Sequence, residues 1–262
     1  MNMKWRFLRK SDLAVCTIYA VFLLLSLAAV GEVGRGRARE AVCLSNVGRL
    51  SQAWLSFAES HDGQLVGGRP LDSPVQWVGR PVFNGTQEQQ LDAIRRGLLF
   101  SFVGDVCIYR CPADEEQRDP NWFDFRSFSI AGGANGEDWS EYIKARKYSD
   151  LANPAQRYVF VEDCDPRGIS ASSWQMNPKS KEWVDPVGMW HDSKSTLGFA
   201  DGHGETRRWR DSSFIAWNLF AMGRPKTFAF GMIPPDNERE DIEYMVGRFP
   251  YKALRGDTGR GS

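Results

Sequence analysis

The sequence lacks net charge. Its 33 lysines and arginines are balanced by 33 aspartates and glutamates. A protein that binds nucleic acid or an anionic membrane surface by electrostatics needs an excess of positive charge, so that class of function is excluded and no nucleic-acid partner is expected. With 262 residues, 42% of them hydrophobic, the chain is still long and apolar enough to bury one sizeable core.

Motifs for the common enzyme chemistries are also missing. The sequence has no nucleophile elbow, no glycine-rich phosphate loop and no zinc-protease helix. It has only three histidines, so acid–base catalysis has few candidate residues. We therefore expect a protein that is not an enzyme, with no catalytic residue and no cofactor-binding residue.

Long hydrophobic runs are scarce, with one exception. Leu13 to Val30 contains no charged residue, and about 20 apolar residues, sometimes as few as about 17, can cross a bilayer. Basic residues within 1–12 predict a cytoplasmic stub before a transmembrane helix at 13–30, with the rest of the chain outside the cytoplasm. A cleaved signal peptide is the alternative, although this run is long for one and lacks a good small-residue cleavage site.

A hinge and an amphipathic stem helix are predicted next, over residues 31–63. Three glycines up to Gly36 are weak helix formers and predict the hinge. Apolar residues then recur at steps of four and three, which places them on one helix face; they are Cys43, Val47, Leu50, Trp54 and Phe57. His61 to Gly63 predicts the helix end, with His61 as a cap or surface side chain.

Short apolar runs separated by Gly, Pro, Asn and Asp predict strands and loops from Gln64 to about Trp209, within an α+β domain that is expected over residues 64–250. The clearest strands are Arg157–Asp163 and Thr196–Asp201. Glu205–Trp209 is expected to pair with the second of them across a tight turn.

The fold class that follows is α+β, with a long N-terminal helix packed on an antiparallel sheet domain. The helix would have a transmembrane half and an amphipathic half. A short C-terminal helix is expected from Asp236, and residues 251–262 are expected to form a flexible tail.

Several stretches resemble one bacterial family. "RAREAVCLSNVGRLSQAWLSFAESHDGQL", which begins at Arg37, resembles the segment after the membrane helix in prepilin-like proteins of the type II secretion pseudopilin kind. His191, nine residues and then Asp201-Gly202 are similar to the signature of the prepilin-type processing-associated H-x9-DG domain. Other similar stretches are "YRCPAD", "RSFSIAGGANG", "WVDPVGMWH" and "DIEYMVGRFPYK".

This resemblance implies a pilin-like fold and a single-pass protein of the bacterial inner membrane. Its N-terminus would be cytoplasmic and its C-terminal domain periplasmic or otherwise extracytoplasmic. Its function would be structural, in the assembly of a type II secretion or type IV pilus-like system. Its expected partners are other pseudopilin-like subunits or secretion-machine proteins.

The start of the chain departs from that family. Family members have a Gly after the basic residue, where a peptidase cuts, and a Glu five residues later that registers subunits in the filament. Ser11 and Asp12 stand here after the basic pair, and Cys16 takes the place of the Glu. We therefore expect an uncleaved, tethered protein. The alternative is a membrane-tethered module on a pilin-like scaffold that binds a polysaccharide or protein ligand and never enters a filament.

Four cysteines follow the apolar run, and they allow three pairings. The resemblance favours Cys43 with Cys111, since both lie in family-like stretches, and this leaves Cys107 with Cys164. Buried thiols that behave as small hydrophobes are the alternative. A zinc site is less favoured, because three residues separate Cys107 from Cys111 and no histidine follows in range.

Calcium is the one metal with candidate ligands, and they are weak. Asp163 and Asp165 begin an oxygen-rich loop, but Arg167 and Trp174 stand where further ligands of such a loop would be. A site assembled from distant carboxylates is one alternative, and a solvated acidic loop is the other. The distant carboxylates would be Asp163, Asp165, Asp185 and Asp192.

His191 and Asp201 invite a catalytic interpretation, but they are expected to be the two ends of one structural unit. His191 would lead into the strand, and Asp201-Gly202 would form the turn after it. Direct contact between the two side chains is the alternative. It would require the intervening segment to fold back, because nine extended residues span up to about 30 Å.

Overall fold

The structure is a computed structural model of the 262-residue chain, and it describes residues 10–82, 85–114, 126–168 and 170–255. Within its first helix, the side chains of residues 10–16, 20 and 23–30 lie outside the described part. These include Ser11, Asp12, Cys16 and most of the predicted transmembrane segment. Among the residues that the structure describes, no helix has both the length and the apolar character to cross a membrane.

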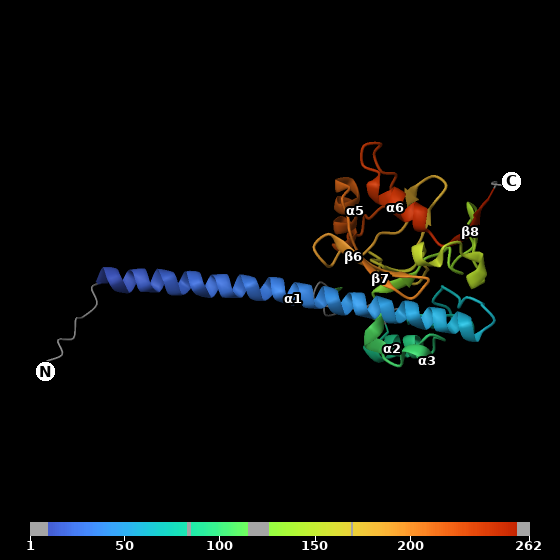
Figure 1. The fold of residues 1–262 in the computed structure, drawn as a ribbon, viewed down its shortest axis with the longest axis horizontal. Coiled ribbons are helices and arrows are strands. Elements are labelled where there is room, and N and C mark those ends of the chain that lie inside the picture. The colour runs from blue at the N-terminus through green and yellow to red at the C-terminus, as the bar shows by residue number, and fades with distance from the viewer. Residues whose placement is uncertain (1–9, 83–84, 115–125, 169, 256–262) are drawn as a thin grey trace.

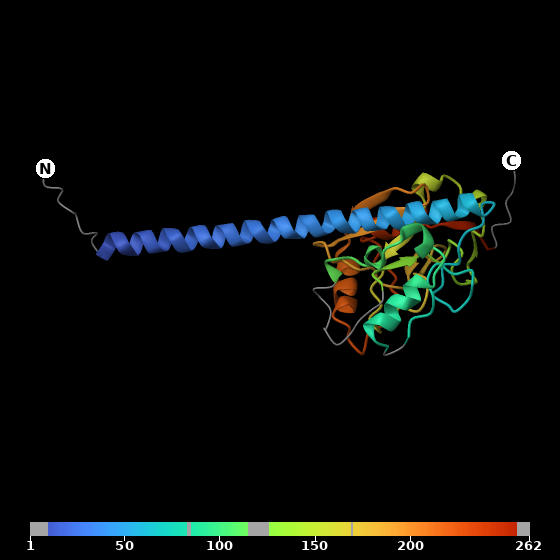
Figure 2. The same ribbon diagram turned by 90° about the horizontal axis from the view of Figure 1, so that it is seen from below.

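One helix, α1 (Lys10–Ser60), dominates the shape of the molecule. Its N-terminal half extends beyond the globular domain, and its C-terminal half lies along that domain (Figures 1 and 2). The hinge predicted up to Gly36 is wrong, because the helix continues through it. Each internal glycine costs about 1 kcal/mol, but a break would leave the unpaired N–H and C=O groups of two new helix ends.

The end of α1 matches the expectation. Gly63 has the positive φ of 75° that favours glycine after a helix. His61 caps the last turn, with its Nδ1 2.8 Å from the carbonyl oxygen of Phe57.

A four-stranded antiparallel sheet forms the centre of the globular domain, in the order β1-β3-β6-β7. Its strands are β1 (Phe128–Ile130), β3 (Tyr158–Glu162), β6 (Lys194–Phe199) and β7 (Gly204–Arg208). The strands predicted near residues 157–163 and 196–201 are confirmed, as is the hairpin between the second strand and its neighbour. The α+β class with an antiparallel sheet is therefore confirmed.

Shorter elements surround this sheet. The helical ones are α2 (Gln87–Arg95), α3 (Phe100–Val103), η1 (Val106–Tyr109), η2 (Tyr148–Asp150), η3 (Pro154–Gln156), α5 (Ser212–Met222) and α6 (Glu240–Arg248). The remaining strands form two small antiparallel pairs, β2 (Tyr142–Lys144) with β8 (Tyr251–Leu254) and β4 (Met176–Asn177) with β5 (Glu182–Trp183).

Two features are expected near the C-terminus: the helix is confirmed, and the flexible tail is wrong in part. The predicted terminal helix is α6, although it begins at Glu240 and not at Asp236. The flexible tail is wrong for residues 251–254, which pair with β2 as β8. Four residues are too short for a clear alternating pattern, and a distant partner decides their structure. Residues 256–262 lie outside the described part of the chain.

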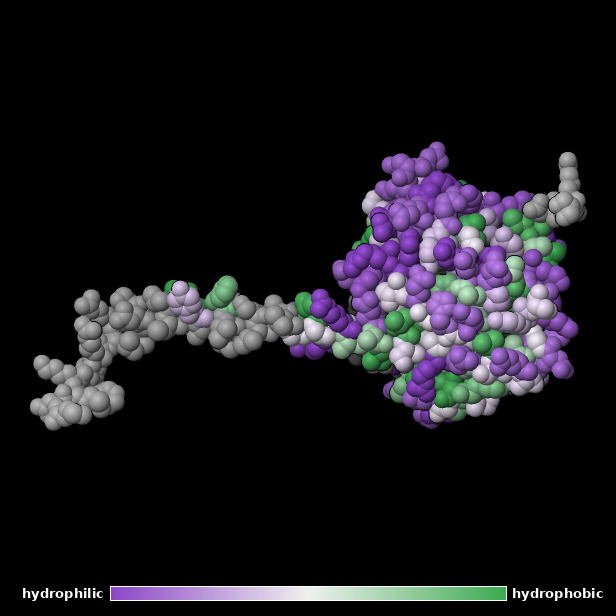
Figure 3. Space-filling view, in the orientation of Figure 1, coloured by the Kyte–Doolittle hydropathy of each residue, from purple (hydrophilic) through white to green (hydrophobic). Residues whose placement is uncertain are grey.

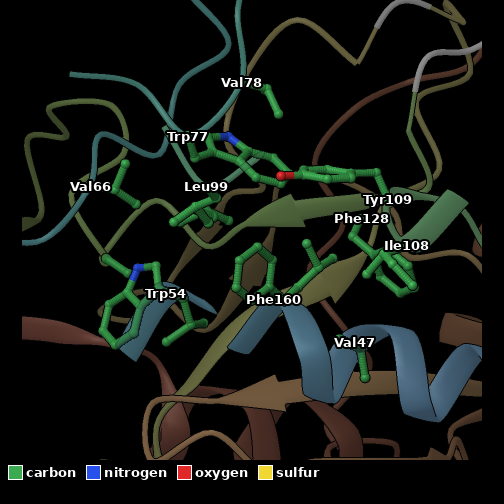
Figure 4. Packing of buried hydrophobic residues seen from close by; sticks show 14 of the residues in the cluster. Val47, Trp54, Val66, Trp77, Val78, Leu99, Ile108, Tyr109, Phe128 and Phe160 are labelled. Atoms are coloured by element: carbon green, nitrogen blue, oxygen red, sulfur yellow. The ribbon is translucent and has the colours of Figure 1, made fainter. Parts of the chain in front are cut away.

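The sheet is covered on both faces. The apolar stripe of α1 packs on one face, and all five of its predicted members are buried. In Figure 4, Val47 and Trp54 of α1 lie on one side of Phe160 of β3, and Trp77 and Tyr109 lie on the other side. The other face carries a second core rich in aromatic residues, to which α5 and α6 contribute Phe214 and Met245.

The contact between α1 and β6 is close. A Cβ atom at Gly198 would lie 2.1 Å from Ser51 Oγ and 3.0 Å from Val47 Cγ2. Glycine is therefore required there for the helix to lie against the strand.

On the exterior, Figure 3 shows polar and apolar residues interspersed over the face of the globular domain that it presents.

Candidate functional site

A buried cluster of four chemically active side chains lies between α1 and the sheet. Cys43 comes from the apolar stripe of α1, and Cys111 follows η1 by two residues. Glu162 is the last residue of β3, and His191 lies in the loop before β6. Cys43, Cys111 and Glu162 are 0% exposed and His191 is 5% exposed, so the cluster is almost fully shielded from bulk water.

The four side chains converge on one point. The Cys43 thiol donates to Glu162 Oε1 over 2.6 Å. His191 Nε2 lies 3.2 Å from Cys111 Sγ and 3.3 Å from Glu162 Oε1. The four potential ligand atoms all lie within 4.8 Å of one another.

The ionisable side chains of this cluster shift the pKa values of Cys43 and His191. Burial raises the pKa of Cys43 well above its usual value, and the neighbouring Cys111 and Glu162 raise it further. Burial lowers the pKa of His191, but hydrogen bonds with Cys111 and Glu162 and the charge of Glu162 outweigh this and raise it to about 10. Without a metal, these shifts favour a neutral thiol at Cys43 and a protonated His191.

The arrangement does not resemble a catalytic triad. In a triad, the histidine contacts the nucleophile through one ring nitrogen and the carboxylate through the other. Here both Cys111 and Glu162 face the same nitrogen, Nε2. The chemistry that this geometry supports is the binding of a proton or a metal cation in a closed site.

The two ends of the H-x9-DG motif lie in different surroundings. His191 belongs to the buried cluster, whereas Asp201 is exposed and contacts His203 Nδ1 at 2.5 Å. Asp201 therefore has a partner other than His191. Gly202 forms the predicted turn with a φ of 95°, and a Cβ there would lie 2.7 Å from Gln52 Oε1 of α1.

The predicted disulfides are not formed. Among the described side chains, Cys43, Cys107, Cys111 and Cys164 form no disulfide. Cys43 and Cys111 nevertheless meet in the cluster. Cys107 is exposed and Cys164 is buried, and neither belongs to the cluster.

The calcium candidates are paired with basic or polar groups. Asp163 accepts a hydrogen bond from Ser129 and lies 3.7 Å from Arg126 Nη1. Asp165 forms a 2.8 Å ion pair with Arg167.

The two distant candidates have partners of their own. Asp185 accepts from the backbone of Gln175, and Asp192 lies on the surface beside Arg208. Among the described residues, none of these carboxylates belongs to a group that could hold a metal ion.

Sequence reasoning missed Glu162 and the role of His191 as its partner. Cys43 and Glu162 are 119 residues apart in the sequence, and Cys111 and His191 are 80 residues apart, so sequence spacing gives no sign of these contacts. The one available signal is the acidic end of an otherwise apolar strand.

No known protein family, curated protein or solved structure matches the chain.

Proposed function

We propose that the protein is a membrane-anchored, pseudopilin-like component of a type II secretion or type IV pilus-like system. It acts through helix packing and protein contacts and catalyses no reaction. The observation that carries this proposal is α1, a single helix of 51 residues that packs on the sheet at one end and projects from the domain at the other (Figure 1). The projecting part, up to about residue 37, is about 40 Å long at about 1.5 Å per residue.

The projecting part of α1 needs a partner. Its described large apolar side chains are Ile18, Tyr19, Val21, Phe22 and Val33, and they are 67%, 71%, 50%, 69% and 56% exposed. A helix gains most of its stability in proteins from packing of its apolar side chains. Lipid or neighbouring helices would supply that packing, as expected for an anchored subunit.

A second apolar surface lies at the end of the domain from which α1 emerges. Figures 1 and 2 both place α5 at that end. Leu219 and Phe220 of α5 are each about half exposed. Phe228 links Phe220 to the exposed Phe230 through ring contacts of 6.2 and 5.1 Å. This α5 surface is suited to contact with a neighbouring subunit.

A tethered binding module is the second candidate. The observation that favours it is the start of the chain, where Ser11 and Cys16 replace the Gly and Glu that the family uses for processing and registration. Loss of that glutamate would remove a specific contact between subunits. Such a module would keep the anchor and use the exposed aromatic surface for its ligand.

Crosslinking and co-purification of the full chain from native membranes separate these candidates. The assembly role predicts crosslinks to a second pseudopilin-like or secretion-machine protein. Leu219→Ser with Phe220→Ser should abolish these crosslinks and lower Tm only slightly, because both side chains are about half exposed. Ile143→Ser is the matched control, since Ile143 is 43% exposed on β2. A chain that purifies from its native membranes without such partners would contradict the assembly role.

A further inference from the structure

The buried cluster between α1 and the sheet contains the ligands of a metal site. We propose that Cys43, Cys111, Glu162 and His191 bind one zinc ion, which fastens the stem helix to the sheet domain. This inference does not depend on the proposed function, because it rests on the geometry of the globular domain alone.

The distances fit a single ion. A zinc ion bound tetrahedrally at about 2.0–2.3 Å places its ligand atoms about 3.3–3.8 Å apart. The contacts of Cys43 with Glu162, Cys111 with His191 and His191 with Glu162 are 2.6, 3.2 and 3.3 Å. All four ligand atoms lie within 4.8 Å of one another. Small side-chain adjustments, outward for these three contacts and inward for any longer separation, therefore suffice to admit the ion.

Neighbouring groups orient two of the ligands. The backbone N–H of Thr196 donates to Glu162 Oε2 over 3.0 Å, which leaves Oε1 directed at the cluster. The backbone N–H of Cys111 donates to Ser127 Oγ over 2.9 Å, which fixes the chain that carries the second sulfur. Such outer contacts are typical of metal sites, where they hold ligands in place before the ion arrives.

The ligand types select the metal. Two thiolates and an imidazole favour zinc over calcium or magnesium, which bind oxygen ligands. Four protein ligands leave no open coordination position, and the cluster is closed to solvent. A closed site of this type is structural and not catalytic.

A disulfide between Cys43 and Cys111 is the competing chemistry. It would use only the two sulfurs and would give Glu162 and His191 no role. Zinc uses all four groups, and its charge offsets much of the negative charge that two thiolates and a carboxylate carry in a buried place. Each thiol releases its proton to water when the metal binds, and the protonated His191 releases one as well, because only a neutral imidazole can bind the ion.

Zinc at this position would connect elements that are far apart in the sequence. The ligands come from α1, from the segment after η1, from β3 and from the loop before β6. Because such a site does not exist in the unfolded chain, zinc binding would stabilise the docking of α1 on the sheet.

Elemental analysis of the purified full-length protein, kept in detergent under reducing conditions, tests this proposal. The expected result is one zinc ion per chain, with a fall in Tm after chelation and recovery when zinc alone is added back. Cys111→Ser should lose the metal, whereas Cys107→Ser should keep it. Cys107 is the matched control because it is exposed, lies four residues away and is not part of the cluster.

A second variant keeps the test decisive if Cys111→Ser fails to fold. Glu162→Gln preserves the size of the side chain, and it should weaken zinc binding by at least about 100-fold, since loss of an outer partner alone costs about 10- to 100-fold. Tetrahedral cobalt bands with thiolate character, absent in Cys43→Ser, are the expected spectroscopic signature.

Two results would overturn the proposal. One is a Cys43–Cys111 disulfide in protein from the native host. The other is reduced protein that takes up no zinc and whose two thiols alkylate equally well with and without the metal.

Discussion

Replacing Gly198 by alanine should loosen the contact between α1 and β6. The new Cβ would lie 2.1 Å from Ser51 Oγ, 3.0 Å from Val47 Cγ2 and 3.1 Å from the Val47 carbonyl oxygen. Ser51 Oγ can rotate away, but the backbone oxygen can move only with the helix. Overpacking of this kind costs about 1–3 kcal/mol. In a domain of this size, that cost corresponds to a fall in Tm of about 2–12 °C.

The assay is thermal unfolding of the full chain, followed by circular dichroism. Ser51→Ala is the rescue variant, since Ser51 Oγ is buried without a hydrogen-bond partner and its loss should cost little. Adding Ser51→Ala to Gly198→Ala should recover part of the lost stability, because the contacts with Val47 persist.

The control is Gly247→Ala in α6, where a Cβ meets nothing within 4 Å. Alanine there should raise stability by up to about 1 kcal/mol, as alanine is the better helix former. If Gly198→Ala were as stable as the wild type, and if Ser51→Ala changed nothing in its presence, the close docking of α1 on β6 would be refuted.

Two further predictions concern buried carboxylates. Asp241→Asn should lower the free energy of unfolding by about 1–3 kcal/mol in urea titrations, because it removes the buried charge that Arg207 contacts over 2.8 Å and leaves Arg207 with Glu240 alone, 3.5 Å away. An unchanged midpoint would contradict this. Burial and then the charge of Asp163 raise the pKa of Asp185 well above its usual value, despite the opposing effect of Arg167. The folded state therefore holds this proton more tightly, and its contribution to stability is lost as pH rises above about 4. Asp185→Asn should raise Tm at pH 7 and flatten the dependence of Tm on pH, and an equal or lower Tm at pH 7 would sink the idea.

Local patterns in the sequence predict the parts of the fold that local forces decide. The stripe from Cys43 to Phe57 predicts the buried face of α1, because a helix repeats its faces every three to four residues. The apolar runs at β3 and β6 likewise predict the central strands. The hinge up to Gly36 fails because helix continuity outweighs the low helix propensity of glycine.

Contacts between residues that are far apart in the sequence decide the parts of the fold that local patterns do not predict. The strand β8 forms only because β2, more than 100 residues earlier, offers it an edge. For the buried cluster, the sequence supplies Cys43, Cys111 and His191 as candidates, but no spacing rule brings them to Glu162. Their meeting depends on how α1 lies on the sheet, which the pattern of any one segment does not contain.

A photo-crosslinker placed at Ile18 in the native host would show whether α1 anchors the protein beside neighbouring helices. Ile18 is exposed on the projecting part of α1, where an anchored assembly subunit must contact lipid and neighbouring helices. We expect the chain to fractionate with the membrane and to form a crosslink to the apolar helix of another pseudopilin-like subunit. A chain recovered in the soluble fraction, with no crosslink at Ile18, would contradict it.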